Sequence, residues 1–378
     1  MAADPIFPLY TVFSLLGSVL VLLVLTTNFV HQSWNIGVSF LCFWLFCELL
    51  TAGINTIIWR DNADLKFYVY CDIISHLHMV TFIVKPACTL LITRRLYKIA
   101  SLRSVLPPTR REKIVDSAVE WSIGLGLPLL VAGVFYYIVQ NARFAILEGS
   151  GCGNTIEVSG VSVIAINSWL IILPCTSVFF YCPKIILVLY RLSRETNNFL
   201  QSGISVSRPS YLRLFALASV DIVLTFPSGV ANIIVDIKSR SPEGAFQFYS
   251  GWASTHSDWA PISYTYKELQ NMGGWSLLNY DLNRWCSVIL SLVIFALFGL
   301  TAEARATYRR GFYAICKPFG LRPPPNPQNL GVSELTHDPL HFSKGTEDET
   351  CPSIVVCVVK DDESFPDLER RLVAEEIS

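Results

Sequence analysis

Three ionisable side chains, Glu48, Lys85 and Asp221, lie inside otherwise apolar stretches of the sequence. A charge in the hydrocarbon of a bilayer costs at least ~2.5 kcal/mol on insertion scales, so such a residue usually has a partner or a function. An ion pair of Lys85 with either Glu48 or Asp221 would reduce this cost, and it could differ between two packings of the helices. The alternative is that each carboxyl group is protonated and hydrogen-bonded locally, with Lys85 extending to the inner interface.

Cys71 and Cys152 differ from the cysteines inside apolar stretches, where a thiol behaves as a small apolar group. Both are expected on the outer side of the membrane, where disulfides form. A disulfide between them would hold the second outer loop over the helices, and two free thiols are the alternative. The cysteines do not follow metal-ligand spacings, and His76 and His78 point to different faces of a helix. We therefore predict no metal, no cofactor and no catalytic residue.

A long segment from Asp236 to Arg284 is unusually aromatic for a solvated connection. It could cover the helices as an apolar lid, or it could receive an apolar or lipidated ligand, because ligand pockets are typically lined by such side chains. The aromatic residues are Phe246, Phe248, Tyr249, Trp252, Trp259, Tyr264, Tyr266, Trp275 and Tyr280.

The elements that must position these residues are membrane spans. With 52% hydrophobic and 16% charged residues, and a mean hydropathy of +0.44, the chain has too little polar surface for a soluble globule of its length. A spanning helix needs roughly twenty predominantly apolar residues. Such stretches occur at Leu9–Val30, Ile36–Trp59, Phe67–Thr93, Trp121–Tyr137, Val161–Tyr190, Tyr211–Val235 and Trp285–Ala302. We predict an all-α membrane protein, a seven-transmembrane helix bundle.

Basic residues orient this bundle. No Lys or Arg precedes Arg60, so the start lacks the basic region of a cleaved signal peptide, and the first stretch is expected to remain as a helix. The connection from Arg94 to Lys113 is the richest in Lys and Arg, and such connections stay cytoplasmic. The N-terminus is therefore predicted outside and the C-terminus in the cytoplasm.

The chain divides into three predicted regions. Residues 1–304 form the seven-helix core, and residues 305–322 carry basic and aromatic side chains suited to an interfacial helix, with Cys316 as a palmitoylation candidate. A proline-rich run and acidic clusters predict a disordered cytoplasmic tail over residues 323–378.

Short motifs on these spans resemble the fungal mating-pheromone receptors of the a-factor-receptor type, which are class D G-protein-coupled receptors. The resemblance extends from Leu9 to Phe319 and is strongest to the paralogous receptors of mushroom-type basidiomycetes. It rests on the order of Asn55-Thr-Ile-Ile-Trp59, Cys71-Asp-Ile73, Arg94-Arg-Leu-Tyr97, Val139-Gln140, Arg143-Phe144, Gly151-Cys152, Trp252-Ala-Ser-Thr-His256 and Phe298-Gly-Leu-Thr301.

The resemblance implies a plasma-membrane receptor for a short peptide pheromone with a farnesylated, carboxymethylated C-terminal cysteine. It also implies a heterotrimeric G protein and a kinase cascade on the inner side. By position, the ligand-binding candidates are Asp72, His76, Trp252, His256, Trp259 and Tyr266. The G-protein-facing candidates are Arg94, Arg95, Arg110, Arg111, Arg191 and Arg194. The alternative for these arginines is that they hold the topology and bind anionic lipid.

Other functional classes fit the residues less well. A light-driven rhodopsin needs a Schiff-base lysine in the seventh span, and Trp285–Ala302 contains none. A transporter is expected to show paired, broken segments in two halves, and the sequence has no internal repeat. We predict a receptor rather than an enzyme, with membrane lipids and a second copy of the chain as further partners and no nucleic acid. An orphan seven-helix membrane protein with a structural or transport role is the alternative.

Overall fold

Seven helices of the structure are long and apolar enough to cross a bilayer, which confirms the predicted seven-helix, multi-pass fold. The computed structural model describes residues 7–30, 35–101, 109–196, 208–240, 247–271 and 273–316. Five of the seven spans are built on long α-helices. These are α1 (Phe7–Val30), α2 (Ile36–Ile58), α3 (Tyr68–Ser101), α10 (Arg208–Arg240) and α13 (Gly274–Ile294).

The fourth and fifth spans alternate α-helical and π-helical turns. The fourth consists of α4 (Arg110–Trp121), η1 (Ser122–Gly126), α5 (Leu127–Leu130), η2 (Val131–Phe135) and α6 (Tyr136–Val139). The fifth consists of α7 (Gly160–Ser162), η3 (Val163–Asn167), α8 (Trp169–Thr176), η4 (Ser177–Tyr181) and α9 (Cys182–Thr196). Pro128 and Pro174 each remove a backbone donor within these spans, which favours local departures from α-helical bonding.

The third helix lies at the centre of the bundle. Of its most apolar window, 67% is buried, against 33–44% for the other six spans. The outward faces of the spans expose large apolar side chains such as Phe179, Phe180 and Val223, at 72%, 68% and 69%. A soluble protein does not expose so much contiguous apolar surface, so these faces are the ones that lipid covers.

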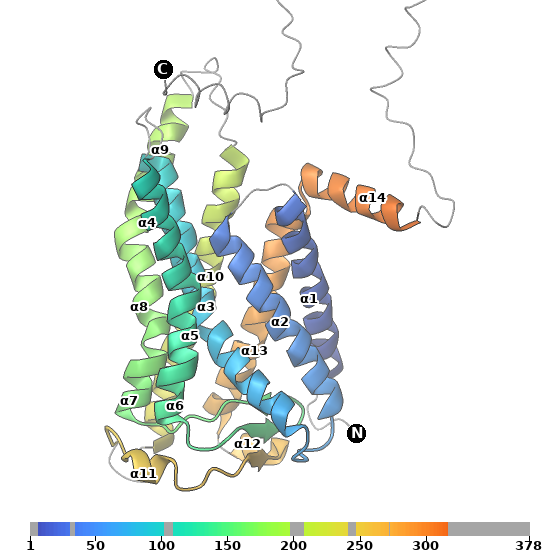
Figure 1. Ribbon diagram of the computed structural model, residues 1–378, viewed down its shortest axis with the longest axis vertical. Coiled ribbons are helices and arrows are strands. Elements are labelled where there is room, and N and C mark those ends of the chain that lie inside the picture. Colours follow the sequence, from blue (N-terminus) through green and yellow to red (C-terminus); the bar gives the residue numbers. More distant parts are fainter. Residues whose placement is uncertain are drawn as a thin grey trace, which may run out of the picture. The chain divides into compact units, whose positions relative to one another are not determined.

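Beside the helices, which bear out the predicted all-α class, the structure contains one small sheet that the sequence did not predict. The strands β1 (Ala145–Leu147), β2 (Gly151–Gly153) and β3 (Ile262–Tyr264) lie in the order β2-β1-β3. β1 pairs antiparallel with β2 and parallel with β3. The sheet lies at the same end of the bundle as the short helices α11 (Trp252–Thr255) and α12 (Tyr266–Asn271), which we call the sheet end (Figure 1). The other end, where α3 ends and α4 begins, is the basic end.

Several helices extend beyond the apolar stretches that predict them. α4 begins at Arg110, eleven residues before the predicted Trp121, and a capping box of Thr109 and Glu112 starts it. α10 continues to Arg240 and α13 begins at Gly274, so the connection predicted from Asp236 to Arg284 is shorter than expected. Hydropathy detects only the part of a helix that crosses hydrocarbon, and polar turns beyond it are missed.

The seventh span continues from α13 into η5 (Phe295–Gly299), and α14 (Ala302–Cys316) follows it. Figure 1 shows α14 directed across the axis of α13 at the basic end. The interfacial position of residues 305–322 stays a prediction. Residues 317–378, including the tail predicted to be disordered, lie outside the described residues.

Candidate functional site

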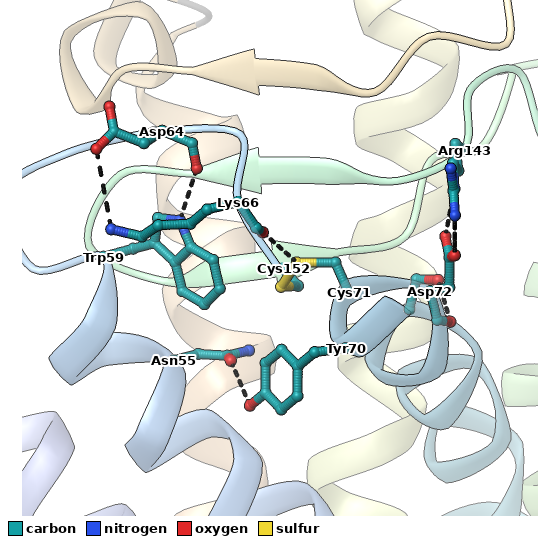
Figure 2. Close-up of a disulfide and its surroundings, with 10 residues drawn as sticks. Asn55, Trp59, Asp64, Lys66, Tyr70, Cys71, Asp72, Arg143 and Cys152 are labelled. Atoms are coloured by element: carbon teal, nitrogen blue, oxygen red, sulfur yellow. Dashed lines mark hydrogen bonds and ion pairs between the residues drawn. A yellow bond between two sulfur atoms is a disulfide. The ribbon is translucent and has the colours of Figure 1, made fainter. Parts of the chain in front are cut away.

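A disulfide joins the first turn of α3 to the sheet at the sheet end (Figure 2). Cys71 and Cys152 are both buried, and they pack with Trp59, Phe144 and Ile146 in a separate apolar cluster. The approach of β2 to Trp59 is close: a Cβ on Gly151, which has φ +78°, would lie 2.6 Å from the indole ring. Glycine meets both the positive φ and the lack of space. The disulfide therefore holds β2 directly over α2 and α3.

An ion pair also joins α3 to the segment that leads into the sheet, because Asp72 follows Cys71 and Arg143 lies just before β1. Nε of Arg143 lies 2.9 Å from Oδ1 of Asp72, and its Nη2 lies 2.6 Å from Oδ2 of Asp72 (Figure 2). The guanidinium group also lies 5.6 Å from the ring of Tyr68. The hydrogen bond to Asp72 raises the pKa of Arg143 above its usual value. Asp72, a predicted ligand-binding residue, is thus bound to Arg143 in the structure.

A cavity of about 630 Å³ opens between this sheet and the interior of the bundle. Side chains from α1, α2, α3, α10, α12 and α13 line it together with β1, β2 and β3. The volume lies within the range typical of pockets for small ligands. The apolar part of the lining includes Leu49, Ala52, Met79, Phe82, Leu147, Ile156, Val158, Ile262 and Leu269.

The deep part of the cavity contains a buried ion pair. Nζ of Lys85 lies 3.1 Å from Oε1 of Glu48 and 2.9 Å from the hydroxyl of Ser287. That hydroxyl also lies 2.8 Å from the same Glu48 oxygen, so three helices meet in one polar cluster. The second oxygen of Glu48 is buried and has no hydrogen-bond partner among the described residues.

Asp221, the third ionisable residue of the interior, accepts its hydrogen bond from Thr89 and is fully buried. Its Oδ1 has no partner within the described part of the chain. Beside it lies a small cavity of about 20 Å³, which is room for one water molecule. Phe82, Lys85 and Asn283 line both this small cavity and the large one, so they separate the two.

One wall of the large cavity is rich in amides. Asn232 of α10 accepts hydrogen bonds from Asn279 (2.7 Å) and Asn283 (2.9 Å) of α13. About one turn further along α10, Asp236 accepts a hydrogen bond from Asn167 at 2.7 Å. Amide groups can donate and accept at once, so this wall suits the backbone of an extended peptide.

The remaining ligand-binding candidates lie elsewhere on the sheet end. His76 is exposed, with its ring 5.3 Å from that of Tyr136. Tyr266 is buried at the start of α12, and its backbone N–H donates to Glu148 at 3.0 Å. The ring of His256 stacks on that of Trp252 and on that of Trp259. None of the six candidates is among the described residues that line the large cavity.

Comparison with known proteins decides what kind of protein carries this cavity. The family model described as "Pheromone A receptor" matches residues 9–317. The chain belongs to the pheromone A receptor family. It is 30% identical to the pheromone B alpha 3 receptor of Schizophyllum commune, over 84% of this chain and 49% of that protein. It is 26% identical to pheromone receptor 2 of Mycosarcoma maydis, over 86% and 92%.

The resemblance seen in the short motifs is thereby confirmed, and the family is one of receptors rather than enzymes. A more distant relative is the pheromone a factor receptor of Saccharomyces cerevisiae, 25% identical over 76% of this chain and 58% of that protein. The chain spans about half the length of the Schizophyllum relatives that it matches.

At the basic end, ion pairs join α3 to α4. Nη2 of Arg94 lies 2.8 Å from Oδ1 of Asp116, and Lys98 contacts the same oxygen. Arg95 is half-buried, whereas Arg110 and Arg111 are exposed in the first turn of α4. Arg191 and Arg194 lie in α9, and Cys316 ends α14, but their side chains lie outside what the structure describes.

Sequence reasoning missed several of these partners. Asp116 was missed because α4 was expected to begin later. A carboxylate that follows the basic end of α3 in the sequence could have indicated an ion pair there. The amides Asn232, Asn279 and Asn283 were missed because uncharged polar residues change hydropathy little. The spacing of Asn279 and Asn283, four residues apart on α13, could have indicated one polar helix face.

Proposed function

We propose that this chain is a G-protein-coupled receptor that binds a lipidated peptide pheromone in the large cavity. The observation that carries the proposal is the cavity itself, in a chain of the pheromone A receptor family: it is open between sheet and bundle and ends at the Glu48–Lys85–Ser287 cluster. The sheet end then faces outside and the basic end faces the cytoplasm, in agreement with the distribution of Lys and Arg.

The lining supports a ligand with both a peptide and an apolar part. The amide wall of Asn232 and Asn283 offers donors and acceptors to a peptide backbone. The apolar lining, including Leu49, Met79 and Phe82, suits a prenyl group, which contributes ~0.8 kcal/mol for each CH₂ buried. The resemblance to a-factor-type receptors implies that this group is farnesyl on a carboxymethylated cysteine.

Signal transmission through the bundle starts at Lys85. A ligand group that hydrogen-bonds Glu48 weakens the hold of Glu48 on Lys85, and Asp221 offers an unused buried oxygen across the small cavity. Lys85 would then exchange a partner on α2 for one on α10. Because ligand binding can shift an equilibrium only by its differential affinity, the two pairings of Lys85 supply the difference between the states.

At the basic end, which faces the cytoplasm in this proposal, the receptor binds its G protein. Exposed arginines at the start of α4, Arg110 and Arg111, contact the heterotrimeric G protein, and Arg94 becomes available when its bond to Asp116 opens. A mitogen-activated kinase cascade then carries the mating signal.

The test is pheromone-dependent signalling in a fungal reporter strain that lacks its own receptor. A panel of farnesylated, carboxymethylated peptides is compared with the same peptides carrying an unmodified cysteine. We expect a response to at least one farnesylated peptide, no response to its unmodified form, and loss of the response when the Gα subunit is deleted. Silence toward the whole panel from receptor shown to be at the cell surface would contradict the proposal and favour the structural or transport alternative.

A further inference from the structure

A row of aromatic side chains is exposed where the segment 247–260 passes the ends of the fourth and fifth spans. Phe248, Trp252 and Trp259 are exposed by 66%, 51% and 38%, and Tyr137 at the end of the fourth span is exposed by 48%. We call these four residues together with His256 the aromatic row. Its members do not appear in the described lining of the large cavity. These side chains are therefore separate from the site proposed for the ligand.

Hydrogen bonds to the start of the fifth span and to Glu157 just before it hold this segment in place. The backbone N–H groups of Gly160 and Val161, at the start of the fifth span, donate to the carbonyls of Gln247 (3.1 Å) and Phe248 (3.0 Å). The carboxylate of Glu157 accepts from the hydroxyls of Ser250 and Thr255, both at 2.5 Å. These bonds fix the segment against the protein while the side chains of Phe248, Trp252 and Trp259 stay exposed.

Within the row, the rings order one another. The imidazole of His256 stacks on the indole of Trp252 at 4.1 Å and 24°, and on that of Trp259 at 5.5 Å and 15°. Its Nε2 lies 3.0 Å from the carbonyl oxygen of Tyr137, whose own ring lies 5.6 Å and 5.9 Å from the two indoles. The stack is thus fixed to the last turn of the fourth span. Figure 1 shows α11, which carries Trp252, beside the ends of α6 and α7.

The surface next to the row is one that lipid covers. Tyr137 belongs to the fourth span, Arg110–Val139, which also exposes Val134 (55%). The neighbouring fifth span, Gly160–Val188, exposes Ile164 (62%). The aromatic row continues this apolar surface at the level where the spans end. Tryptophan and tyrosine prefer that level because their rings are apolar while their N–H and O–H groups remain near water.

We propose that the aromatic row is a membrane anchor, which seats the segment 247–260 in the headgroup region of the bilayer at the sheet end. Its partner is the lipid surface, not the peptide ligand. The anchor also has a consequence for the cavity, because the segment leads directly into β3, whose Ile262 and Tyr264 line it. Lipid contact at the row therefore helps to position one wall of the cavity, which restricts where β3 can lie when the cavity is empty.

The test measures where the two indoles lie, in receptor reconstituted into nanodiscs without any ligand. Tryptophan fluorescence is quenched by lipids brominated near the carbonyl end of the acyl chain, by lipids brominated near its methyl end, and by iodide in the water. The variants are Trp252→Phe, Trp259→Phe and the double substitution, each of which keeps an aromatic ring. The matched control is Trp59→Phe, because Trp59 is fully buried at the same end.

We expect the Trp252→Phe and Trp259→Phe variants each to lose part of the emission that the shallow brominated lipid quenches, and the double variant to lose more. Quenching by the deep brominated lipid should stay the same, and Trp59→Phe should change neither. If the emission lost in the variants is instead quenched by iodide and not by the shallow lipid, the segment is a lid in water and the proposal is wrong. If added farnesylated peptide shields that emission from the shallow lipid, the row binds ligand and the proposal is equally wrong.

Discussion

The ammonium group of Lys85 lies 3.1 Å from the carboxylate of Glu48, and this bond joins α3 to α2 at the deep end of the cavity. The two side chains are exposed by only 14% and 17%. Removing one member of such a pair leaves the other charge buried and uncompensated, which costs more than removing both.

We therefore expect Lys85→Met and Glu48→Gln each to destabilise the purified receptor by about 3–5 kcal/mol, and the double variant to recover much of that loss. Thermal unfolding in detergent measures it, with Lys184→Met as a control on a lysine whose ammonium group lies 5.0 Å from the ring of Tyr97. Destabilisation in the double variant equal to the sum of the two single effects would show that the residues do not interact.

Asp221 is predicted to act in signalling rather than in binding. Asp221→Asn keeps an acceptor for Thr89 but removes the negative charge that would receive Lys85. We expect unchanged pheromone affinity and a reduced maximal response in the reporter strain. Thr89→Val is the complementary control, because it removes the hydrogen bond that Asp221→Asn keeps and leaves the charge that Asp221→Asn removes. Its maximal response should stay close to that of the parent. A parallel loss in both variants would mean that packing, not charge, is what matters here.

The disulfide between Cys71 and Cys152 is predicted to stabilise the fold as a bond, with no separate role for either thiol. Cys71→Ser, Cys152→Ser and the double substitution should lower stability to the same extent, by roughly 2–5 kcal/mol, because each removes the same bond across 81 residues. Cys175→Ser serves as the control, since Cys175 is a free thiol. Thermal unfolding with and without reductant provides the measurement, and reductant should reproduce the effect of the substitutions in the parent. Unequal single variants would point to a separate role for one of the thiols.

The ion pair of Asp72 with Arg143 should contribute to stability independently of pH around neutrality. The pKa of Arg143 is raised in the folded protein, so its contribution is fully present below the ordinary arginine pKa and is lost only as pH rises through the higher folded value. We expect Asp72→Asn to lower the unfolding temperature by the same amount on either side of neutrality. A strong dependence in that range would assign the effect to another group.

At the basic end, Asp116 holds both Arg94 and Lys98. Asp116 is exposed by 37%, so the pairs stabilise the fold by only ~0.2–1 kcal/mol each. Asp116→Asn should leave stability almost unchanged but raise signalling without pheromone, because Arg94 is released toward the G protein. Asp61→Asn, an exposed carboxylate at the other end of the same bundle, is the control for charge alone. An unchanged basal signal would indicate that the contact only fixes the α3–α4 packing.

Much of the helix order could be predicted from the sequence, because the length of an apolar run is itself the physical requirement for crossing a bilayer. The ends of the helices could not, since a helix such as α4 continues into water through polar turns started by Thr109 and Glu112. The small sheet was missed for a related reason. Strands of three residues such as Ala145–Leu147 have no periodicity to detect, and β3 joins them from a distant part of the chain.

The candidate site shows the same division. That Glu48, Lys85 and Asp221 need partners follows from the cost of charge in hydrocarbon, which holds for any packing of the helices. Which carboxylate Lys85 meets depends on the rotation and tilt of α2, α3 and α10 about one another, and these are set by packing across the whole bundle. Likewise, the aromatic character of the segment containing Trp252 and Trp259 is plain in the sequence. The direction of those rings was decided only by hydrogen bonds that Glu157 and Tyr137 accept and Gly160 donates. These residues lie about a hundred positions away in the chain, and the fold brings them into contact.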